Sequence, residues 1–167
     1  MNNNVFIYFK LWKEYFAFDI NYAVEVMKLP QDIVPVPSAP EYVLGVFNYR
    51  GEIIPVIDLR KKFKLPDQNN DLYLLVIKHI IGNKQEKLAL AVDKILDVIN
   101  VTQQDISQFP ELGSRYNVEF IYGVINYNDK FILVLNMEKI LSSAEIEIIR
   151  SIKKKGLENE QSQTPDN

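Results

Sequence analysis

Short apolar runs separated by polar breaks fill most of the chain, and this pattern predicts β-strands rather than helices. The runs are rich in β-branched and aromatic residues, which favour an extended backbone. A polar break around residues 67–71 divides them into two groups of five. The predicted strands are Val5–Leu11, Glu14–Ile20, Ala23–Lys28, Tyr42–Tyr49, Glu52–Leu59, Leu72–Ile80, Lys87–Val92, Lys94–Val101, Tyr122–Tyr127 and Lys130–Asn136.

The second half of the chain repeats the first. The stretch GVFNYRGEIIPVIDL, residues 45–59, aligns without a gap with GVINYNDKFILVLNM, residues 123–137. The similarity continues upstream, where Glu25 aligns with Asp97 after a two-residue gap. A gapless match at Gly, Val, Asn and Tyr is hard to obtain by chance, so we interpret the chain as two related units.

The two units, about residues 5–66 and 72–140, are each small for an independent hydrophobic core. We therefore expect a mainly β fold in which two five-stranded β-barrels pack on one another. Such packing also limits the number of exposed sheet edges. A single β-sandwich with accidental internal similarity is the alternative. In either arrangement, residues 5–155 form one domain.

One α-helix is predicted near the C-terminus, over residues 142–155. It opens with the capping-box sequence Ser-Ser-Ala-Glu, and its isoleucines recur along one face. Gly156 stands where a C-terminal cap is expected, so the helix should end there. Residues 1–4 and 156–167 have no apolar period, and we expect both segments to be disordered.

Composition excludes several classes of function. The chain has no cysteine and one histidine, His79, which leaves no ligand set for a thiolate or histidine-rich metal site and little basis for nucleophilic catalysis. The formal net charge is −3 with dispersed lysine and arginine, unlike a nucleic-acid-binding surface. No apolar run could span a membrane, and no signal peptide is evident. Carboxylates beside strands, Asp58 and Asp93 among them, are expected at turns or on the surface.

The two aligned hairpins differ at their turns, where the first copy has Arg50-Gly51 and the second has Asn128-Asp129. A two-residue hairpin turn requires positive φ angles, which suit Gly, Asn and Asp better than Arg. Either Arg50 is a solvated residue without consequence, or its guanidinium folds back onto a carboxylate. Glu25 is the predicted partner. Removing one partner would cost about 3–5 kcal/mol in a buried pair and about 0–1 kcal/mol in an exposed one.

The pattern GVxNxRGxIxPVxDL at residues 45–59 resembles the signature of the CheW family, the adaptor proteins of bacterial chemotaxis. The resemblance extends over about residues 5–152 and includes FAFDI, the proline-rich crossover and ALAVDKILDV. It implies two packed five-stranded SH3-like barrels without catalytic activity or cofactor. It also implies a cytoplasmic scaffold that couples the tip of a methyl-accepting chemotaxis receptor to the regulatory domain of the histidine kinase CheA. Such a scaffold would act in receptor arrays at the inner face of the membrane, without inserting into it.

The resemblance further implies a receptor-binding groove between the barrels, into which an apolar helical tip would fit. Surfaces that face the kinase are expected as exposed apolar patches at the barrel ends. The ion pair of the motif would be Glu25 with Arg50. The expected groove residues are Val24, Val26, Val43, Gly45, Arg50 and Tyr73.

Two other functions are compatible with the residues. An adaptor of a chemosensory-like pathway that controls pili or development would carry the same motifs. A small-ligand-binding or enzymatic β-barrel is of a different class, and it predicts a deep pocket lined by convergent polar groups instead of shallow apolar surfaces.

Overall fold

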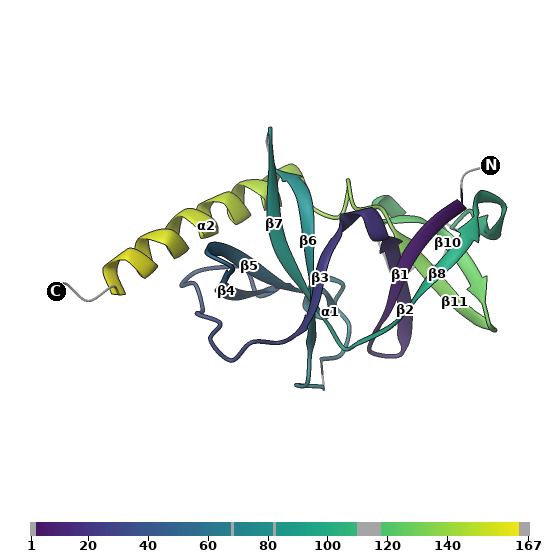
Figure 1. The fold of residues 1–167 in the computed structure, drawn as a ribbon, viewed down its shortest axis with the longest axis horizontal. Coiled ribbons are helices and arrows are strands. Elements are labelled where there is room, and N and C mark those ends of the chain that lie inside the picture. Colours follow the sequence, from purple (N-terminus) through teal and green to yellow (C-terminus); the bar gives the residue numbers. More distant parts are fainter. Residues whose placement is uncertain (1–2, 68, 82, 110–117, 164–167) are drawn as a thin grey trace.

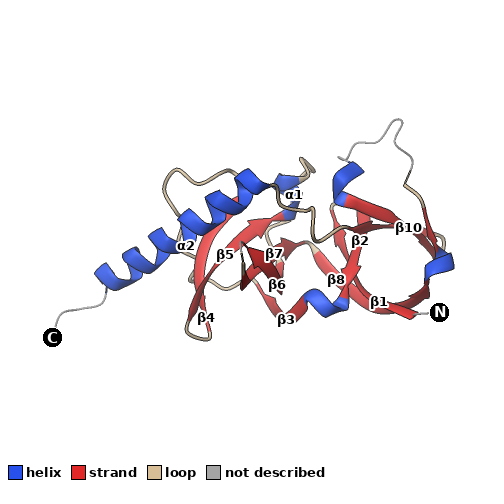
Figure 2. Cartoon of the chain, turned by 90° about the horizontal axis from the view of Figure 1, so that it is seen from above, coloured by secondary structure: helices blue, strands red, loops and turns tan. Residues whose placement is uncertain are grey.

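A computed structural model describes residues 3–67, 69–81, 83–109 and 118–163. It shows two curled β-sheets side by side, with one long helix lying against one of them (Figure 1, Figure 2). The strands are β1 (Asn3–Leu11), β2 (Glu14–Asp19), β3 (Ala23–Lys28), β4 (Val43–Tyr49), β5 (Glu52–Asp58), β6 (Tyr73–Ile81), β7 (Lys84–Val92), β8 (Lys94–Thr102), β9 (Ile106–Ser107), β10 (Ile121–Tyr127) and β11 (Lys130–Leu135). The helices are α1 (Leu59–Lys62) and α2 (Ser143–Gln163), with short 3-10 turns η1 (Ile20–Tyr22), η2 (Gln103–Asp105) and η3 (Val118–Phe120).

The mainly β prediction is confirmed. All ten predicted strands are present, with ends that differ by at most three residues, and β9 is an additional strand of two residues. A two-residue strand is too short to show an alternating pattern, so the sequence gives no signal for it.

The sheets reveal how the two sequence units combine. One sheet has the order β8-β1-β2-β11-β10-β9 and the other has the order β3-β6-β7-β5-β4. The first two strands of each unit therefore join the sheet that contains the last three strands of the other unit. Apart from β9, both sheets have the same order of equivalent strands. The repeat is thus a real structural symmetry, and the units exchange their first hairpins because neither completes a sheet alone.

The largest hydrophobic core lies between the sheets. Phe9, Phe16 and Phe18 from β1 and β2 are fully buried there against Leu75 and Ile77 of β6. Burial of a side chain of this size contributes about 1.5–3 kcal/mol. Each sheet also encloses a smaller apolar cluster of its own. The inter-sheet core therefore fixes the two sheets relative to each other.

Glycine recurs at the start of both GVxNY segments because another segment crosses there. Val34 forms two backbone hydrogen bonds with Val46 on β4, and a Cβ on Gly45 would lie 2.3 Å from the carbonyl oxygen of Val34. In the second unit, a Cβ on Gly123 would lie 2.5 Å from Cγ2 of Ile106 in β9. Real Cβ atoms do not approach so closely, so both positions exclude larger residues.

Helix α2 begins as predicted but continues farther. The Ser142 hydroxyl accepts a hydrogen bond from the backbone N–H of Glu145, whose carboxylate accepts one from the backbone N–H of Ser142, which confirms the capping box. The predicted end at Gly156 is wrong, because α2 runs to Gln163 and projects beyond the sheets (Figure 1). A glycine inside a helix costs only about 1 kcal/mol relative to alanine, and the following residues include good helix formers.

The predicted N-terminal boundary is also too late. Asn3 and Asn4 belong to β1 and pair with Thr102 and Val101 of β8, since an extended backbone can add to a neighbouring strand whatever its side chains. The expected disorder of residues 1–2 and 164–167 concerns positions outside the described residues.

The start of α2 is fastened to the five-stranded sheet by a partly buried polar cluster. Lys62 of α1 donates a hydrogen bond to Glu145, and its Nζ lies 5.1 Å from the centre of the Tyr42 ring. Burial, followed by the charge and hydrogen bond of Glu145, raises the pKa of Tyr42 to about 12. Burial alone would raise the pKa of Glu145, but the hydrogen bond from Lys62 and that from Ser142 hold it below its ordinary range.

Candidate functional site

Glu25 of β3 reaches the turn between β4 and β5. Its carboxylate accepts hydrogen bonds from the Tyr49 hydroxyl and from Nη2 of Arg50, which lies 3.3 Å from Oε1 and 3.2 Å from Oε2. The guanidinium carbon of Arg50 lies 5.4 Å from the centre of the Tyr49 ring, within the range of a cation–π contact. The hydrogen bond to Glu25, with burial second, raises the pKa of the Tyr49 hydroxyl. These three side chains connect β3 and β4, the two edge strands of their sheet.

The pair of Glu25 and Arg50 is largely exposed. The side chain of Arg50 is 74% accessible and that of Glu25 33% accessible, so the pair contributes about 0–1 kcal/mol. Arg50 has a φ of 50°, a left-handed conformation that costs a residue with a Cβ about 1–2 kcal/mol. Asn128 occupies the equivalent position with a φ of 49° and has a side chain that tolerates it better. Fold stability therefore does not explain an arginine at this turn.

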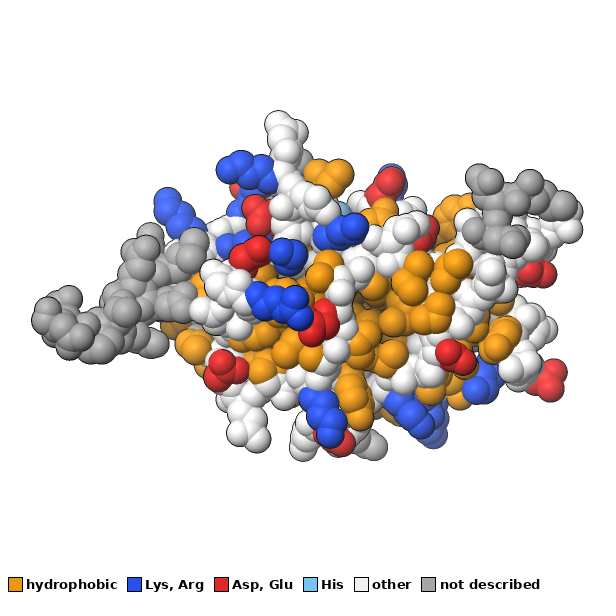
Figure 3. Space-filling model, viewed as in Figure 1, with side chains coloured by type: hydrophobic (Ala, Val, Ile, Leu, Met, Phe, Trp, Pro, Cys, Tyr) orange, Lys and Arg blue, Asp and Glu red, His pale blue; other side chains and the backbone are white. Residues whose placement is uncertain are grey.

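The exposed apolar part of the expected groove lies on β3. Side chains alternate along this strand, and Val24 and Val26 are 40% and 46% accessible whereas Glu25 faces the opposite side. Val26 and the half-buried Tyr73 of β6 share one face, because Lys28 is the register partner of Tyr73. Hydrophobic side chains gather over β3 and continue over β1 and β8 of the other sheet (Figure 3). This continuous apolar surface crosses the junction of the sheets.

Two of the expected groove residues lie elsewhere. Val43 is buried with Val36 and Ile152 beneath α2, and Gly45 is buried against Val34. Neither offers a surface to a partner, because α2 and the proline-rich crossover cover this side of β4. The six residues are therefore not brought together, and the exposed ones are divided between the surface of β3 and the turn that carries Arg50.

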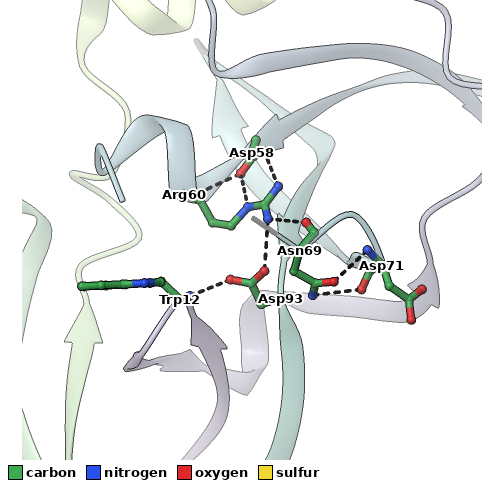
Figure 4. Close-up of polar contacts among 6 residues, drawn as sticks. All are labelled: Trp12, Asp58, Arg60, Asn69, Asp71 and Asp93. Atoms are coloured by element: carbon green, nitrogen blue, oxygen red, sulfur yellow. Dashed lines mark hydrogen bonds and ion pairs between the residues drawn. The ribbon is translucent and has the colours of Figure 1, made fainter. Parts of the chain in front are cut away.

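A buried ionic network at the junction of the sheets escaped the sequence analysis. Arg60 donates through Nε and Nη2 to the two oxygens of Asp58, at 3.2 and 3.1 Å, and through Nη1 to Asp93 at 3.1 Å (Figure 4). Asp93 also accepts a hydrogen bond from the backbone N–H of Trp12 in the turn between β1 and β2. Asp93 lies at the corner between β7 and β8, in line with the expected turn position, although its side chain is only 11% accessible. For Asp58, which is fully buried at the end of β5, the expectation of a turn or surface position is wrong. The motif Asp-Leu-Arg at residues 58–60 was the available signal.

Burial alone would lower the pKa of Arg60, but the hydrogen bonds and negative charges of Asp58 and Asp93 raise it overall, so Arg60 stays charged. The fork geometry of a guanidinium satisfies a buried carboxylate with two parallel hydrogen bonds. The network joins the end of β5, the corner between β7 and β8 and the turn of the first hairpin. It therefore holds both sheets in one arrangement.

His79 is buried, and its ring nitrogens lie against the carbonyl oxygens of Ile80 and Met137. A hollow of about 500 Å³ beside it is lined mainly by polar residues of η1 and the β6–β7 hairpin. Within the described ranges, no group of three or more His, Cys, Asp or Glu residues could hold a metal ion. Across the same ranges, no helix is long and apolar enough to span a membrane. His79 thus packs between the β6–β7 hairpin and the segment that carries Met137.

Comparisons with known proteins agree with the geometry. Residues 5–145 match the family model described as CheW-like domain. The chain is 36% identical over 149 residues to the chemotaxis protein CheW of Treponema pallidum, covering 86% of this chain and 85% of that protein. It is 37% identical over 138 residues to the chemotaxis protein CheW of Helicobacter pylori, covering 81% and 80% of the two chains.

A solved structure has the same fold. The crystal structure of the scaffolding protein TtCheW from Thermoanaerobacter tengcongensis superposes with a TM-score of 0.74 at 28% identity. The superposition covers 85% of this chain and 90% of that protein. Together, the family match over most of the chain, the relatives above 30% identity and the shared fold show that this chain belongs to the CheW-like domain family, whose members are chemotaxis adaptors.

Proposed function

We propose that this chain is a non-catalytic scaffold that couples methyl-accepting chemotaxis receptors to the histidine kinase CheA. The observation that carries the proposal is the exposed apolar surface of β3, with Val24 and Val26, together with a strained and exposed Arg50 at the turn that Glu25 of the same strand contacts. Single exposed apolar residues are ordinary, but a contiguous apolar surface at a sheet junction is typical of a protein-binding site. Membership in a family of adaptors favours this function over a ligand-binding or enzymatic barrel.

The β3 surface is the proposed contact for the cytoplasmic tip of the receptor. Val24, Val26 and Tyr73 would receive the apolar residues of a helical tip, a mode in which a helix lies in a shallow groove. Arg50 would then bind a carboxylate or a carbonyl oxygen of the tip, since only its Nη2 is engaged by Glu25. This contact would place the protein in the cytoplasm, within receptor arrays at the inner face of the membrane.

The proposed kinase contact lies on the other sheet. Phe131 of β11 is 69% accessible and Tyr122 of β10 is 53% accessible, and both lie on the side of that sheet opposite its own enclosed core. Exposed aromatic residues are enriched among the side chains that dominate binding energy at protein interfaces. A scaffold needs two separate surfaces, and these two belong to different sheets.

A pull-down with purified partners tests the proposal. The full-length chain should retain both a receptor-tip fragment and the regulatory domain of CheA, and binding to neither would overturn the assignment. Val26→Asp should weaken retention of the receptor tip about tenfold or more, because a charge would be buried in an apolar contact. Ile148→Asp is the matched control, since Ile148 is an exposed apolar residue of α2, at 37% accessibility, outside the proposed contacts.

An adaptor of a pathway that controls pili or development would have the same surfaces. The genes adjacent to the coding sequence, and the receptors encoded with it, decide between the two pathways.

A further inference from the structure

The two sheets have four edges, and along three of them another segment or a side chain engages at least one outward backbone group. An edge strand presents unpaired N–H and C=O groups that can pair with another chain. The edge of β4 is covered by Val34, whose N–H donates to the carbonyl of Val46 at 2.8 Å and whose carbonyl accepts in return at 2.9 Å. In the other sheet, β9 covers β10 in the same way. On β8, the backbone N–H of Val98 donates to Oδ1 of Asp97 at 2.7 Å.

The fourth edge, on β3, is open. In an antiparallel ladder, hydrogen-bonded and non-bonded pairs alternate along the strand. The N–H of Leu29 donates to the carbonyl of Leu72 at 3.0 Å, so Met27 and Glu25 are the next positions bonded to β6. The backbone N–H and C=O of Val26 consequently point away from β6. In the described part of the chain, no hydrogen bond reaches these outward groups.

The repeat shows why this edge differs from that of β8. Glu25 and Asp97 are equivalent in the two units, and each precedes a valine whose N–H points outward. Asp97 turns back and accepts the N–H of Val98. Glu25 instead faces Arg50 and the Tyr49 hydroxyl, so Val26 is left without this side-chain acceptor. The arginine of the first hairpin turn thus holds the carboxylate away from the strand edge that it could block.

We infer that the open edge of β3 is a strand-addition site for an extended segment of a partner protein. The added strand would pair with the outward backbone groups of Val26 and Lys28, and its apolar side chains would pack beside Val24 and Val26. Arg50 is an exposed cation at the Glu25 side of this edge, opposite the face of Val24 and Val26, so the segment should carry acidic residues between its apolar ones. Lys28 is an exposed cation on the face of Val24 and Val26 and favours an acidic residue at the end of the apolar stripe. The inference goes beyond the proposed function and does not depend on it, because it concerns the backbone edge of β3 and not a helical tip.

Amide hydrogen exchange tests the open edge in the free, full-length protein. The amides of Val26 and Lys28 should exchange rapidly, whereas those of Glu25 and Met27, bonded to β6, should be protected. The amide of Val98 should exchange more slowly than that of Val26, because it donates a hydrogen bond to Asp97. Protection of Val26 in dilute free protein would show a closed edge and would overturn the inference.

A peptide measures strand addition directly. The probe is a capped synthetic peptide in which valine and glutamate alternate. Its length is about seven residues, within the usual range for a strand. The peptide should protect the Val26 amide, and Val26→Pro should weaken its binding about tenfold, because proline removes the outward N–H and leaves the bonds to β6 intact. Lys28→Pro removes the next outward N–H on the same edge and serves if Val26→Pro does not fold.

Val98→Pro is the matched control, since it removes the outward N–H of the equivalent strand. The inference would be contradicted if Val26→Pro bound the peptide as tightly as the unaltered chain does. It would also be contradicted if Val98→Pro weakened peptide binding as much as Val26→Pro does. Protection of Val26 that grows with protein concentration in the absence of peptide would assign the edge to a second copy of this chain and would also contradict it. Retention of the receptor tip by Val26→Pro together with loss of the peptide would separate this site from the receptor contact.

Discussion

Arg50 is a residue that the geometry of its turn disfavours, so its presence there requires a functional explanation. Its φ of 50° suits glycine or asparagine, and its exposed pair with Glu25 offsets little of the strain. The second copy of the hairpin has Asn128 and lacks an arginine, so the hairpin itself does not require one. Arg50 contacts Glu25 of the edge strand β3 and the ring of Tyr49, and most of its side chain is exposed. We therefore expect Arg50 to contact a partner protein.

The variant Arg50→Gly separates these two roles. We expect the free energy of unfolding to stay the same or to rise by up to about 1 kcal/mol, because glycine adopts positive φ without strain. Binding of the receptor tip should fall about tenfold or more. Urea unfolding and titration with the tip fragment measure the two effects. Asn128→Gly, at the equivalent turn, should leave binding unchanged, and a loss of more than about 2 kcal/mol of stability in Arg50→Gly would assign Arg50 a structural role.

Arg60 is the opposite case, a charged residue whose role is structural. Its side chain is 4% accessible, and that of Asp58 is 1% accessible. Arg60→Met would leave two carboxylates beside the sheet junction without their counter-charge, at a cost of about 3–5 kcal/mol in the free energy of unfolding. Chemical denaturation measures the loss. Arg150→Met, which removes an exposed pair with Glu147 on α2, should cost at most about 0.5 kcal/mol; similar losses in the two variants would refute the role of the network.

At the scale of the element, α2 depends on the ionisation of Glu145. The pKa of Glu145 is lowered in the folded chain, so its contribution is present above the ordinary glutamate pKa of about 4.3 and is lost as the pH falls through the lower folded value. The stability difference between the unaltered chain and Glu145→Gln should therefore narrow as the pH falls from about 6 to about 3. Thermal unfolding across this range measures it. In Glu147→Gln, at an exposed position, no comparable narrowing is expected.

The strands were predictable from sequence and several details were not, for physical reasons. Alternating apolar residues specify a half-buried strand locally, and the capping box specifies the start of α2. The end of α2 was misplaced because glycine in a helix is only mildly unfavourable. The burial of Val43 and Gly45 depends on α2, which reaches β4 from the far end of the chain, and on the proline-rich crossover, which folds back onto the strand that follows it.

At the scale of the whole molecule, the repeat indicated two related units but not how they share strands. Sequence alignment relates equivalent strands and carries no information on which neighbour each strand pairs with. The structure shows that the first hairpin of each unit pairs with the last three strands of the other unit. Glu25 and Arg50 belong to the same unit, and their contact was predicted from the sequence. Arg60 and Asp93 belong to different units, and their contact was not predicted because it depends on how the units share strands.

This exchange has a consequence for function. Because both sheets contain strands of both units, we expect the chain to unfold as one cooperative unit. We also expect the proposed receptor contact on β3 to keep a fixed distance from the proposed kinase contact on β10 and β11. A scaffold that holds two partners in a set geometry requires such rigidity. The two proposed contacts lie on different sheets, so both partners can be bound together.

Co-sedimentation of CheA with an assembled receptor-tip fragment tests the central claim most directly. Kinase should appear in the pellet only when this full-length chain is present. Val26→Asp should abolish that recruitment while the variant still binds the kinase regulatory domain, whereas Ile148→Asp should recruit kinase normally. Recruitment that is unchanged without the chain, or unchanged with Val26→Asp, would contradict a scaffold that holds the receptor through β3.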